Sequence, residues 1–229
     1  MKSKEVTKNE RRATSDERRN TNLIAIDGPA GAGKTTLAKL LAKRLGLLYI
    51  DTGAMYRSLT WEIMKLNIDF NNRDLVIDAA KKIDIGVKPD GENLEIRTPK
   101  VTENVFYVAQ IKEVREEMVR IQRNFARENG VVMEGRDIGT VVFPSAPKKI
   151  YLDAELSERA SRRFKEFKLR GFESTISEIE KELAERDKKD KTREYGPLKM
   201  AVDAVYLDTT SLDIPEMVER AVEIIGSPL

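Results

Sequence analysis

The 229-residue sequence contains no cysteine and no histidine. The absence of cysteine excludes a disulfide scaffold, a thiolate nucleophile and any cysteine-ligated metal. The absence of histidine excludes Ser-His-Asp catalysis, imidazole acid–base chemistry and the common zinc sites. No run of uncharged apolar residues approaches the roughly 18 that a membrane-spanning helix needs, so no membrane partner is expected. An enzyme of this composition must work with carboxylates, lysines, arginines, hydroxyls and a bound hard cation.

Charged residues make up 35% of the chain, but they are unevenly distributed. The first 21 residues carry seven basic and four acidic side chains, whereas the other 208 carry 34 basic and 35 acidic ones. Residues 1–21 show no apolar periodicity and no apolar secretory segment, so we predict a disordered charged tail and a cytoplasmic protein. The near-neutral remainder argues against a dedicated nucleic-acid binder.

Short apolar runs alternate with helical periodicity along the chain. Runs typical of buried parallel strands lie at residues 23–26, 47–50, 131–133, 149–152 and 205–207. Helical spacing is found at residues 35–45, 54–66, 75–82, 110–129, 156–169 and 214–225. The alternation predicts an α/β fold with a five-stranded parallel sheet flanked by helices. Residues 83–87 and 94–97 are predicted to form a small hairpin in an insert.

A phosphate-binding motif lies between the first strand and the first helix. Residues 28–35 read Gly-Pro-Ala-Gly-Ala-Gly-Lys-Thr and match G-x-x-x-x-G-K-[ST]. Its glycines let successive backbone amides point inward, and the helix N-terminus adds the positive end of its dipole. Lys34 is predicted to reach the terminal phosphates of ATP or GTP, and the Thr35 hydroxyl to ligate Mg²⁺. The motif predicts nucleotide binding without identifying the reaction.

Arginines follow two of the predicted strands. Arg57 comes after the second and Arg136 after the third, at the sheet edge where parallel sheets bind ligands. Because guanidinium groups bind phosphate in a bidentate manner, the two predict a clamp for a second phosphate. Arg186 and Arg193, in a charged segment further along, are predicted to swing over the transferring phosphoryl group. Candidates to join them lie on the preceding helix: Arg159, Arg162 and Arg163.

Together, these blocks resemble the bacterial cytidylate kinase family. In family order they are IAIDGPAGAGKTT, DTGAMYR, EGRDIGTVVFP, IYLDA, ERASRRF, ERDKKDKTR and LDTTSLDI. The resemblance implies the P-loop NTPase fold of the nucleoside monophosphate kinases. The expected parts are a core at residues 22–66, 100–170 and 196–229, an NMP-binding insert at 67–99 and a helical lid at 171–195. It also implies a cytoplasmic enzyme of pyrimidine metabolism, expected as a monomer, that phosphorylates CMP and dCMP with ATP and Mg²⁺.

The resemblance also assigns site residues by position. The ATP-binding set is Gly28, Pro29, Ala30, Gly31, Ala32, Gly33, Lys34, Thr35 and Thr36. The CMP-binding set is Thr52, Tyr56, Arg57, Arg115, Arg136, Asp137, Arg186, Asp190 and Arg193. Within it, Arg57, Arg136 and Arg193 match contacts to the CMP phosphate, Arg115 and Asp137 contacts to cytosine, and Arg186 and Asp190 contacts to the ribose and lid. The catalytic candidates are Lys34, Arg159, Arg163, Arg186 and Arg193, with Thr35 as metal ligand.

Two features depart from the family pattern. Phe106 stands where the family commonly has a serine near the cytosine amino group, which leaves tolerance of UMP open, and the insert looks shorter than usual. The acceptor phosphate is already anionic near neutral pH, so the reaction requires no general base. Asp51 and Glu134 are candidates to hold Mg²⁺ through waters.

Two alternative functions remain open. The first is another small-molecule kinase, of the adenylate or dephospho-coenzyme-A type, which a panel of acceptors would distinguish. The second is a nucleotide-dependent RNA-associated protein that uses the basic tail. Truncation of residues 1–21 tests it through loss of salt-sensitive RNA binding.

Overall fold

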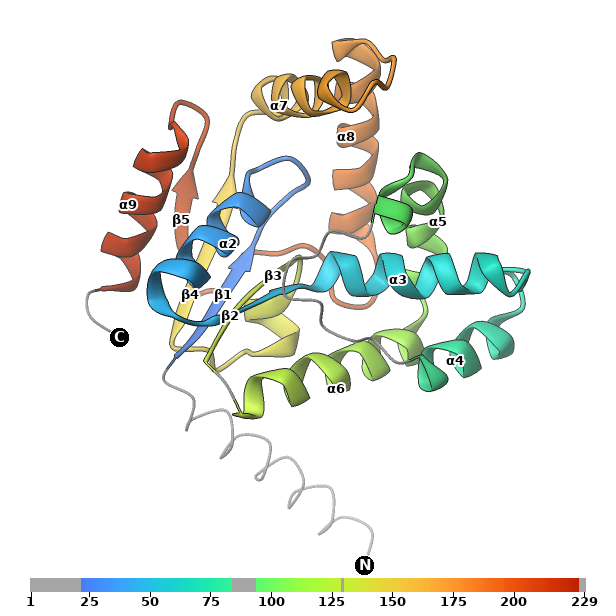
Figure 1. Cartoon of the computed structure of the whole chain (residues 1–229). Coiled ribbons are helices and arrows are strands. Elements are labelled where there is room, and N and C mark those ends of the chain that lie inside the picture. Colours follow the sequence, from blue (N-terminus) through green and yellow to red (C-terminus); the bar gives the residue numbers. More distant parts are fainter. Residues whose placement is uncertain (1–21, 84–93, 129, 227–229) are drawn as a thin grey trace, which may run out of the picture.

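The computed structural model describes residues 22–83, 94–128 and 130–226. The predicted tail and residues 84–93 of the predicted hairpin lie outside these ranges. The described chain contains one five-stranded parallel sheet in the order β2-β3-β1-β4-β5 (Figure 1). Its strands are β1 (Leu23–Asp27), β2 (Leu48–Asp51), β3 (Val131–Gly135), β4 (Lys148–Asp153) and β5 (Val205–Asp208). The predicted α/β architecture is therefore confirmed, and the order and the loop after β1 are those of the P-loop NTPase fold.

Helices cover both faces of this sheet. They are α2 (Lys34–Leu45), α3 (Thr52–Lys65), α4 (Arg73–Lys82), α5 (Pro99–Ala109), α6 (Lys112–Glu128), α7 (Leu156–Leu169), α8 (Ile176–Thr192) and α9 (Ile214–Ile225). Two irregular turns complete the described elements: the 3₁₀ helix η1 (Leu94–Arg97) and the π-helix η2 (Ile138–Val142). Among the described residues, no helix has the length and apolarity that crossing a bilayer requires.

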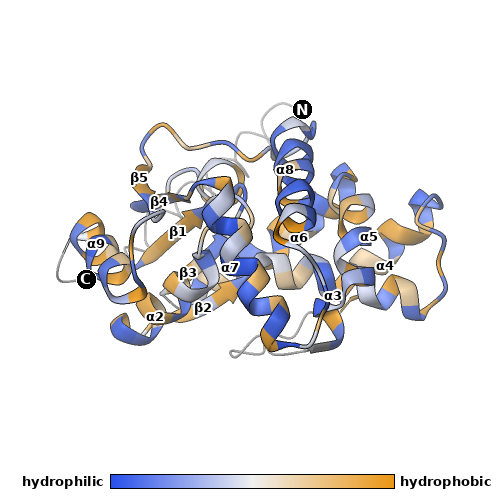
Figure 2. Ribbon diagram, turned by 90° about the horizontal axis from the view of Figure 1, so that it is seen from above, coloured by the Kyte–Doolittle hydropathy of each residue, from blue (hydrophilic) through white to orange (hydrophobic). Residues whose placement is uncertain are grey.

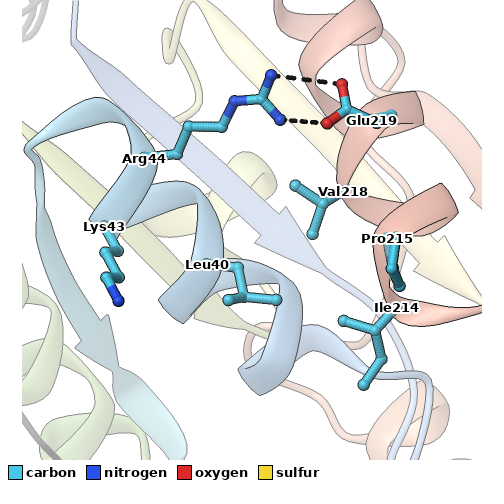
Figure 3. Close-up of a pocket in the computed structure, with 7 residues that line it drawn as sticks. All are labelled: Leu40, Lys43, Arg44, Ile214, Pro215, Val218 and Glu219. Atoms are coloured by element: carbon cyan, nitrogen blue, oxygen red, sulfur yellow. Dashed lines mark hydrogen bonds and ion pairs between the residues drawn. The ribbon is translucent and has the colours of Figure 1, made fainter.

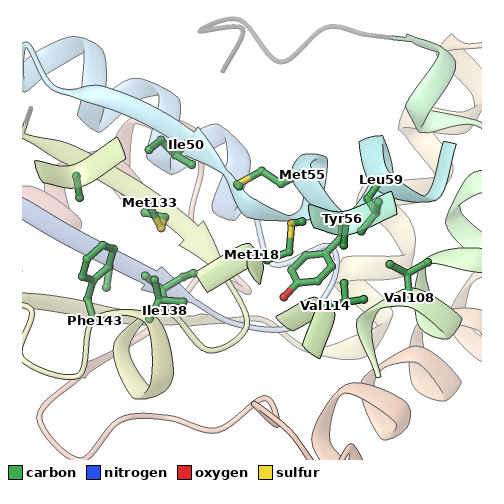
Figure 4. Close-up of a cluster of buried hydrophobic side chains, with 14 of the residues drawn as sticks. Ile50, Met55, Tyr56, Leu59, Val108, Val114, Met118, Met133, Ile138 and Phe143 are labelled. Carbon is green, nitrogen blue, oxygen red and sulfur yellow. The ribbon is translucent and has the colours of Figure 1, made fainter. Parts of the chain in front are cut away.

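Side-chain alternation along β1 divides the interior into two cores. Ile24 and Ile26 pack toward α2 and α9, whereas Leu23 and Ala25 pack toward α6 and η2. Because successive side chains of a strand point to opposite faces, a strand buried on both faces must be apolar throughout. Figure 4 shows the second core, where side chains of β3 and η2 meet those of α3 and α6. In Figure 2, β1 is hydrophobic in colour, whereas α7 and α8 are largely hydrophilic.

Helix α8 carries the charged segment that the sequence predicts as a lid. It begins with a capping box in which Thr175 and Glu178 each accept a hydrogen bond from the other's backbone amide. An apolar strip that includes Ile179 and Leu183 packs against α7, and Ala30 of the P-loop belongs to the same cluster. Figure 1 shows α7 and α8 beyond the strand ends that bear the P-loop. The helix is thus tied to the sheet domain through the P-loop.

The predicted strand at residues 94–97 is wrong. These residues form η1, a single 3₁₀ turn. Ile96 is buried, Arg97 pairs with Asp51, and Thr98 immediately caps α5. Four residues of alternating polarity fit either one helical turn or a short strand, and tertiary contacts selected the turn. Helix α5 itself has no counterpart in the sequence prediction.

Candidate active site

Residues 28–35 wrap around the end of β1 as a phosphate-binding loop. Gly28, Gly31 and Gly33 all have positive φ, and a Cβ on Gly28 would run into the carbonyl oxygen of Leu152. Gly33 is the N-cap of α2 and has no side chain to cap it, so the first amides of α2 are left for a ligand. The glycines that the sequence motif singled out are therefore needed by the backbone itself.

Lys34 lies buried beneath this loop. Its Nζ donates to the carbonyl oxygen of Pro29 at 2.5 Å. Burial, followed by the nearby charge of Arg136, lowers the pKa of Lys34 to about 7, although Glu134 opposes this shift. A lysine held in this way gains a strong partner when a polyanion enters the loop. The environment of Lys34 therefore favours a bound phosphate.

Carboxylates at the ends of β2 and β3 lie beside Lys34. Glu134 is buried, accepts a hydrogen bond from Tyr49 Oη at 2.6 Å and is also hydrogen-bonded to Thr35. Burial and the adjacent Asp51 raise the pKa of Glu134. Thr52 Oγ1 donates to the Glu134 carbonyl oxygen at 2.7 Å. These contacts bring hard oxygen donors together next to the phosphate-binding loop.

The oxygen donors fit Mg²⁺, provided that a nucleotide completes the coordination. Within the described ranges, no three Asp or Glu side chains gather closely enough to hold a metal ion by themselves. Mg²⁺ usually retains several waters and binds through one or two carboxylates plus substrate phosphates. The Thr35 hydroxyl, with Glu134 hydrogen-bonded to it and Asp51 nearby, supplies that kind of partial site.

A second group of cations faces this loop from α3. Arg57 Nη2 donates to Asp51 Oδ2 at 3.0 Å, and Arg97 Nη2 donates to the same oxygen at 3.1 Å. Burial would raise the pKa of Asp51, but the two guanidinium groups outweigh it and hold this pKa below its usual value. Arg57 Nε is buried and has no hydrogen-bond partner among the residues described. Arg57 therefore has a donor available for an incoming anion.

Arg136 and Arg193 lie between β3 and the end of α8. Arg136 Nε donates to Asp190 Oδ2 at 2.8 Å. Arg193 lies 3.6 Å from both Asp137 and Asp190 and donates to the Gly196 carbonyl oxygen. Its buried Nη2 makes no hydrogen bond within the described part of the chain. The predicted phosphate-contacting residues are thus brought together from distant parts of the sequence.

Arg115 and Asp137 form a buried pair beside this group. Arg115 Nη2 donates to Asp137 Oδ2, and Arg115 Nη1 donates to the Ala109 carbonyl oxygen at 3.2 Å. The guanidinium of Arg115 also lies over the ring of Tyr56, 5.5 Å from its centroid. Nearby, Phe106 on α5 has Lys189 of α8 over its ring at 5.2 Å. A planar base next to this pair would meet donors and acceptors in fixed positions.

The remaining predicted arginines divide into two kinds. Arg186 is half-buried, and burial together with Arg136 lowers its pKa to about 10. Arg159 is buried and pairs with Asp187 at 2.6 Å, whereas Arg163 pairs with Glu166 at 2.8 Å and lies over Phe167. Arg162 donates to Thr209 Oγ1 at 3.1 Å. Among these four arginines, Arg186 keeps its guanidinium available for a ligand in this structure.

Asp27 is a site residue that the sequence analysis missed. This buried carboxylate accepts hydrogen bonds from the amides of Ile138 at 2.8 Å and Gly139 at 2.7 Å. Burial raises its pKa to about 6, although these two amides oppose the shift. It ties the end of β1 to the segment that presents Arg136 and Asp137. Its place directly before the glycine motif was the available signal.

A separate groove of about 550 Å³ lies between α2 and α9 (Figure 3). It is lined by Leu40, Lys43, Arg44, Ile214, Pro215, Val218 and Glu219. Arg44 and Glu219 pair across it at 2.5 Å, so their charges are already neutralised. None of the predicted site residues lines this groove, and its lining offers no arrangement for phosphate chemistry.

Comparisons with known proteins find related sequences over nearly the whole chain. The family model described as cytidylate kinase matches residues 24–227. Cytidylate kinases of Bacillus cereus strain B4264 and Bacillus thuringiensis strain Al Hakam are each 47% identical over 215 residues, covering 89% of this chain and 95% of the relative. A solved structure of a Chloroflexus aurantiacus protein covers 88% of this chain and 95% of its own, with 16% identity and a TM-score of 0.37.

Proposed function

Because this chain belongs to the cytidylate kinase family, we propose that it transfers the γ-phosphoryl group of ATP directly to CMP or dCMP, with Mg²⁺, to give the diphosphate and ADP. The observation that carries the proposal is the meeting of two cationic sites at one edge of the sheet. The P-loop with Lys34 forms one, and half-buried arginines of α3, of the segment after β3 and of α8 form the other. Arg136 and Arg186 both influence the pKa of Lys34, so the two sites share one space.

We assign the donor to the P-loop and the acceptor to the arginine group. Residues 28–36 bind the ATP phosphates in this assignment. Thr52, Tyr56, Arg57, Arg115, Arg136, Asp137, Arg186, Asp190 and Arg193 surround the monophosphate, its ribose and its base. Arg57 Nε and Arg193 Nη2 support this assignment, because a buried donor without a hydrogen bond is costly until a ligand accepts one from it.

The reaction then depends on alignment and charge. The acceptor phosphate oxygen is already anionic and attacks the γ-phosphorus while the bond to ADP breaks, so no proton needs to be removed from it. Lys34, Arg186 and Arg193 stabilise the equatorial and leaving-group oxygens. Thr35 would hold Mg²⁺, with Glu134 and Asp51 oriented toward its waters, and the ion would neutralise phosphate charge. Arg136 and Arg57 fix the acceptor in line.

We further propose that the chain is divided as the family resemblance implies. The lid comprises residues 171–195, the NMP-binding insert residues 67–99, and the core residues 22–66, 100–170 and 196–229. Helix α8 packs mainly against α7 among the described elements, which supports a lid that moves as a unit. We expect a monomer that works in the cytoplasm, with no nucleic acid or membrane as partner.

A panel of acceptors tests the proposed function. Purified protein with ATP and Mg²⁺ is offered CMP, dCMP, UMP, AMP and dephospho-coenzyme A, and ADP release is followed. CMP and dCMP should be phosphorylated fastest, and a chelator should abolish turnover. Preference for AMP or dephospho-coenzyme A would instead indicate one of the rival kinases. Turnover of UMP close to that of CMP would show that Phe106 relaxes base choice.

Asp137→Asn is expected to weaken the discrimination between CMP and UMP about tenfold. The carboxylate only accepts hydrogen bonds and so favours the amino group of cytosine, whereas an amide also donates to the uracil carbonyl. A hydrogen-bonded contact to the edge of a base contributes roughly 1–3 kcal/mol of discrimination. The ratio of kcat/KM values for CMP and UMP measures the effect. Asp203→Asn removes a carboxylate that pairs with Lys149 and should leave the ratio unchanged. Unchanged base choice in Asp137→Asn would remove this residue from base recognition.

A further inference from the structure

The buried guanidinium of Arg159 joins the P-loop to helix α8. Its Nη1 donates to the carbonyl oxygen of Ala30 at 3.0 Å and to Asp187 Oδ2 at 2.6 Å. Its Nε donates to the Ala154 carbonyl oxygen at 2.9 Å. The side chains of Arg159 and Asp187 are only 8% and 10% exposed. One side chain therefore connects the phosphate-binding loop, the start of α7 and the middle of α8.

Close packing reinforces this connection. A Cβ on Gly31 would lie 3.1 Å from Arg159 Cβ and 3.3 Å from the Arg159 carbonyl oxygen. Ala30 belongs to the same apolar cluster as Ala160 of α7 and Ile179 of α8. Because well-packed interiors transmit small displacements, we expect a shift of α8 to displace the tip of the P-loop as well.

Asp187 sits between residues that face the reaction space. Arg186 precedes it and Asp190 follows it one turn later on α8. Asp187 also lies near Arg136, since its negative charge helps to raise the pKa of that guanidinium. Its Oδ1 is buried and has no hydrogen-bond partner in the described residues. A buried carboxylate that is only partly satisfied lowers stability, which calls for a role other than stabilising the fold.

We propose that the chain of contacts Asp187–Arg159–Ala30 is a positioning element that sets α8 against the P-loop, so that Arg186 points at the phosphates of the donor. The proposal rests on the phosphoryl transfer proposed above and assigns two residues that need not touch either substrate. When ATP occupies the P-loop, the backbone amides of the loop and the Ala30 peptide are held in place. Through its contacts with both groups, Arg159 then restrains Asp187. Binding of ATP therefore orders the lid helix α8 through these contacts.

Asp187→Asn tests the proposal, because it preserves shape and one acceptor while removing the charge that holds Arg159. We expect kcat to fall about 10- to 100-fold, the range in which misplacement of a catalytic group by about 1 Å lies. The KM for CMP should change less than about threefold, because the acceptor contacts remain. Glu185→Gln, an exposed charge removal on the same helix, should behave as wild type. Thermal unfolding of both variants establishes that they fold.

Hydrogen exchange gives a readout that does not depend on turnover. In the wild-type protein, ATP should slow amide exchange both in the P-loop and in α8. In Asp187→Asn, ATP should still protect the P-loop but protect α8 much less. In Arg159→Lys, ATP should likewise protect the P-loop but protect α8 much less. The double variant should lose little more protection of α8 than either single variant, because the two residues act as a unit.

Two outcomes would overturn the inference. One is a wild-type kcat in Asp187→Asn, and the other is full ATP-dependent protection of α8 in that variant. The proposed function fails separately, if the wild-type protein does not phosphorylate CMP. In that case the exchange experiment still decides whether the P-loop and α8 are linked, because it requires only ATP binding.

Discussion

Lys34→Met is expected to lower kcat about 1,000-fold or more while the fold persists. Lys34 is the cation directly beneath the P-loop, and its Nζ donates to a neutral acceptor, the carbonyl oxygen of Pro29. A charge that stabilises a transferring phosphoryl group contributes on the order of 10³ or more in rate. Methionine retains most of the buried volume of lysine. Steady-state turnover of CMP with saturating ATP measures the loss.

Lys43→Met is the matched control, since Lys43 is exposed on the same helix. It should retain wild-type turnover. Near-normal turnover in Lys34→Met would contradict the assignment of the P-loop as the donor site, because no other described cation occupies its position.

The same substitution should change stability in a pH-dependent way. Folding lowers the pKa of Lys34 from 10.5 to about 7. Below pH 7 Lys34 is charged in the folded protein, and the full cost of burying that charge lowers its stability. Between about pH 7 and 10.5 the unfolded chain binds more protons at this site, so stability rises with pH there. Lys34→Met removes this penalty. It should therefore raise Tm relative to wild type at pH 6, with a smaller gain at pH 9.

Glu134 strengthens the expected trend. Without Lys34, this buried carboxylate loses a favourable charge, so its ionisation at higher pH costs the variant more stability. Unfolding scans without nucleotide at the two pH values measure both contributions. A Tm difference between variant and wild type that grew from pH 6 to pH 9 would contradict the lowered pKa.

Arg57→Ala is expected to reduce kcat/KM for CMP about 100- to 1,000-fold, with little effect on the KM for ATP. Removal of a preorganised donor to a reacting oxyanion typically costs about 3–4 kcal/mol. The fold should survive because Arg97 continues to pair with Asp51 at 3.1 Å, so no carboxylate is left buried alone. Arg57→Lys should recover part of the loss, because it restores charge without the bidentate geometry.

Arg73→Ala provides the comparison for this variant. Arg73 is an exposed arginine on α4 that pairs with Glu113 at 2.7 Å. Its removal should leave kcat/KM for CMP within about twofold of wild type, as expected for a surface ion pair. If Arg57→Ala were equally mild, the acceptor would have to bind elsewhere.

Local sequence signals determined the sheet, its helices and the donor site. Apolar runs bounded by turn residues predict the five strands, because a strand covered on both faces must be apolar throughout. The phosphate-binding loop is equally local: its glycines, the helix start and Lys34 lie within eight residues. Likewise Gly46, in the left-handed conformation, ends α2 where the apolar spacing stops.

Tertiary structure decided the partners of the charged groups. Asp51 accepts a hydrogen bond from Arg97, 46 residues further along the chain. Asp190 accepts one from Arg136, and these two residues are 54 positions apart. No local pattern encodes such pairs, since the order of the strands and the return of α8 bring them together. The same holds for Arg159: in the sequence it resembles a lid arginine, yet burial against the P-loop engages it with Ala30 and Asp187. Periodicity records which residues must be buried, whereas the contacts of a buried charge depend on which elements pack around it.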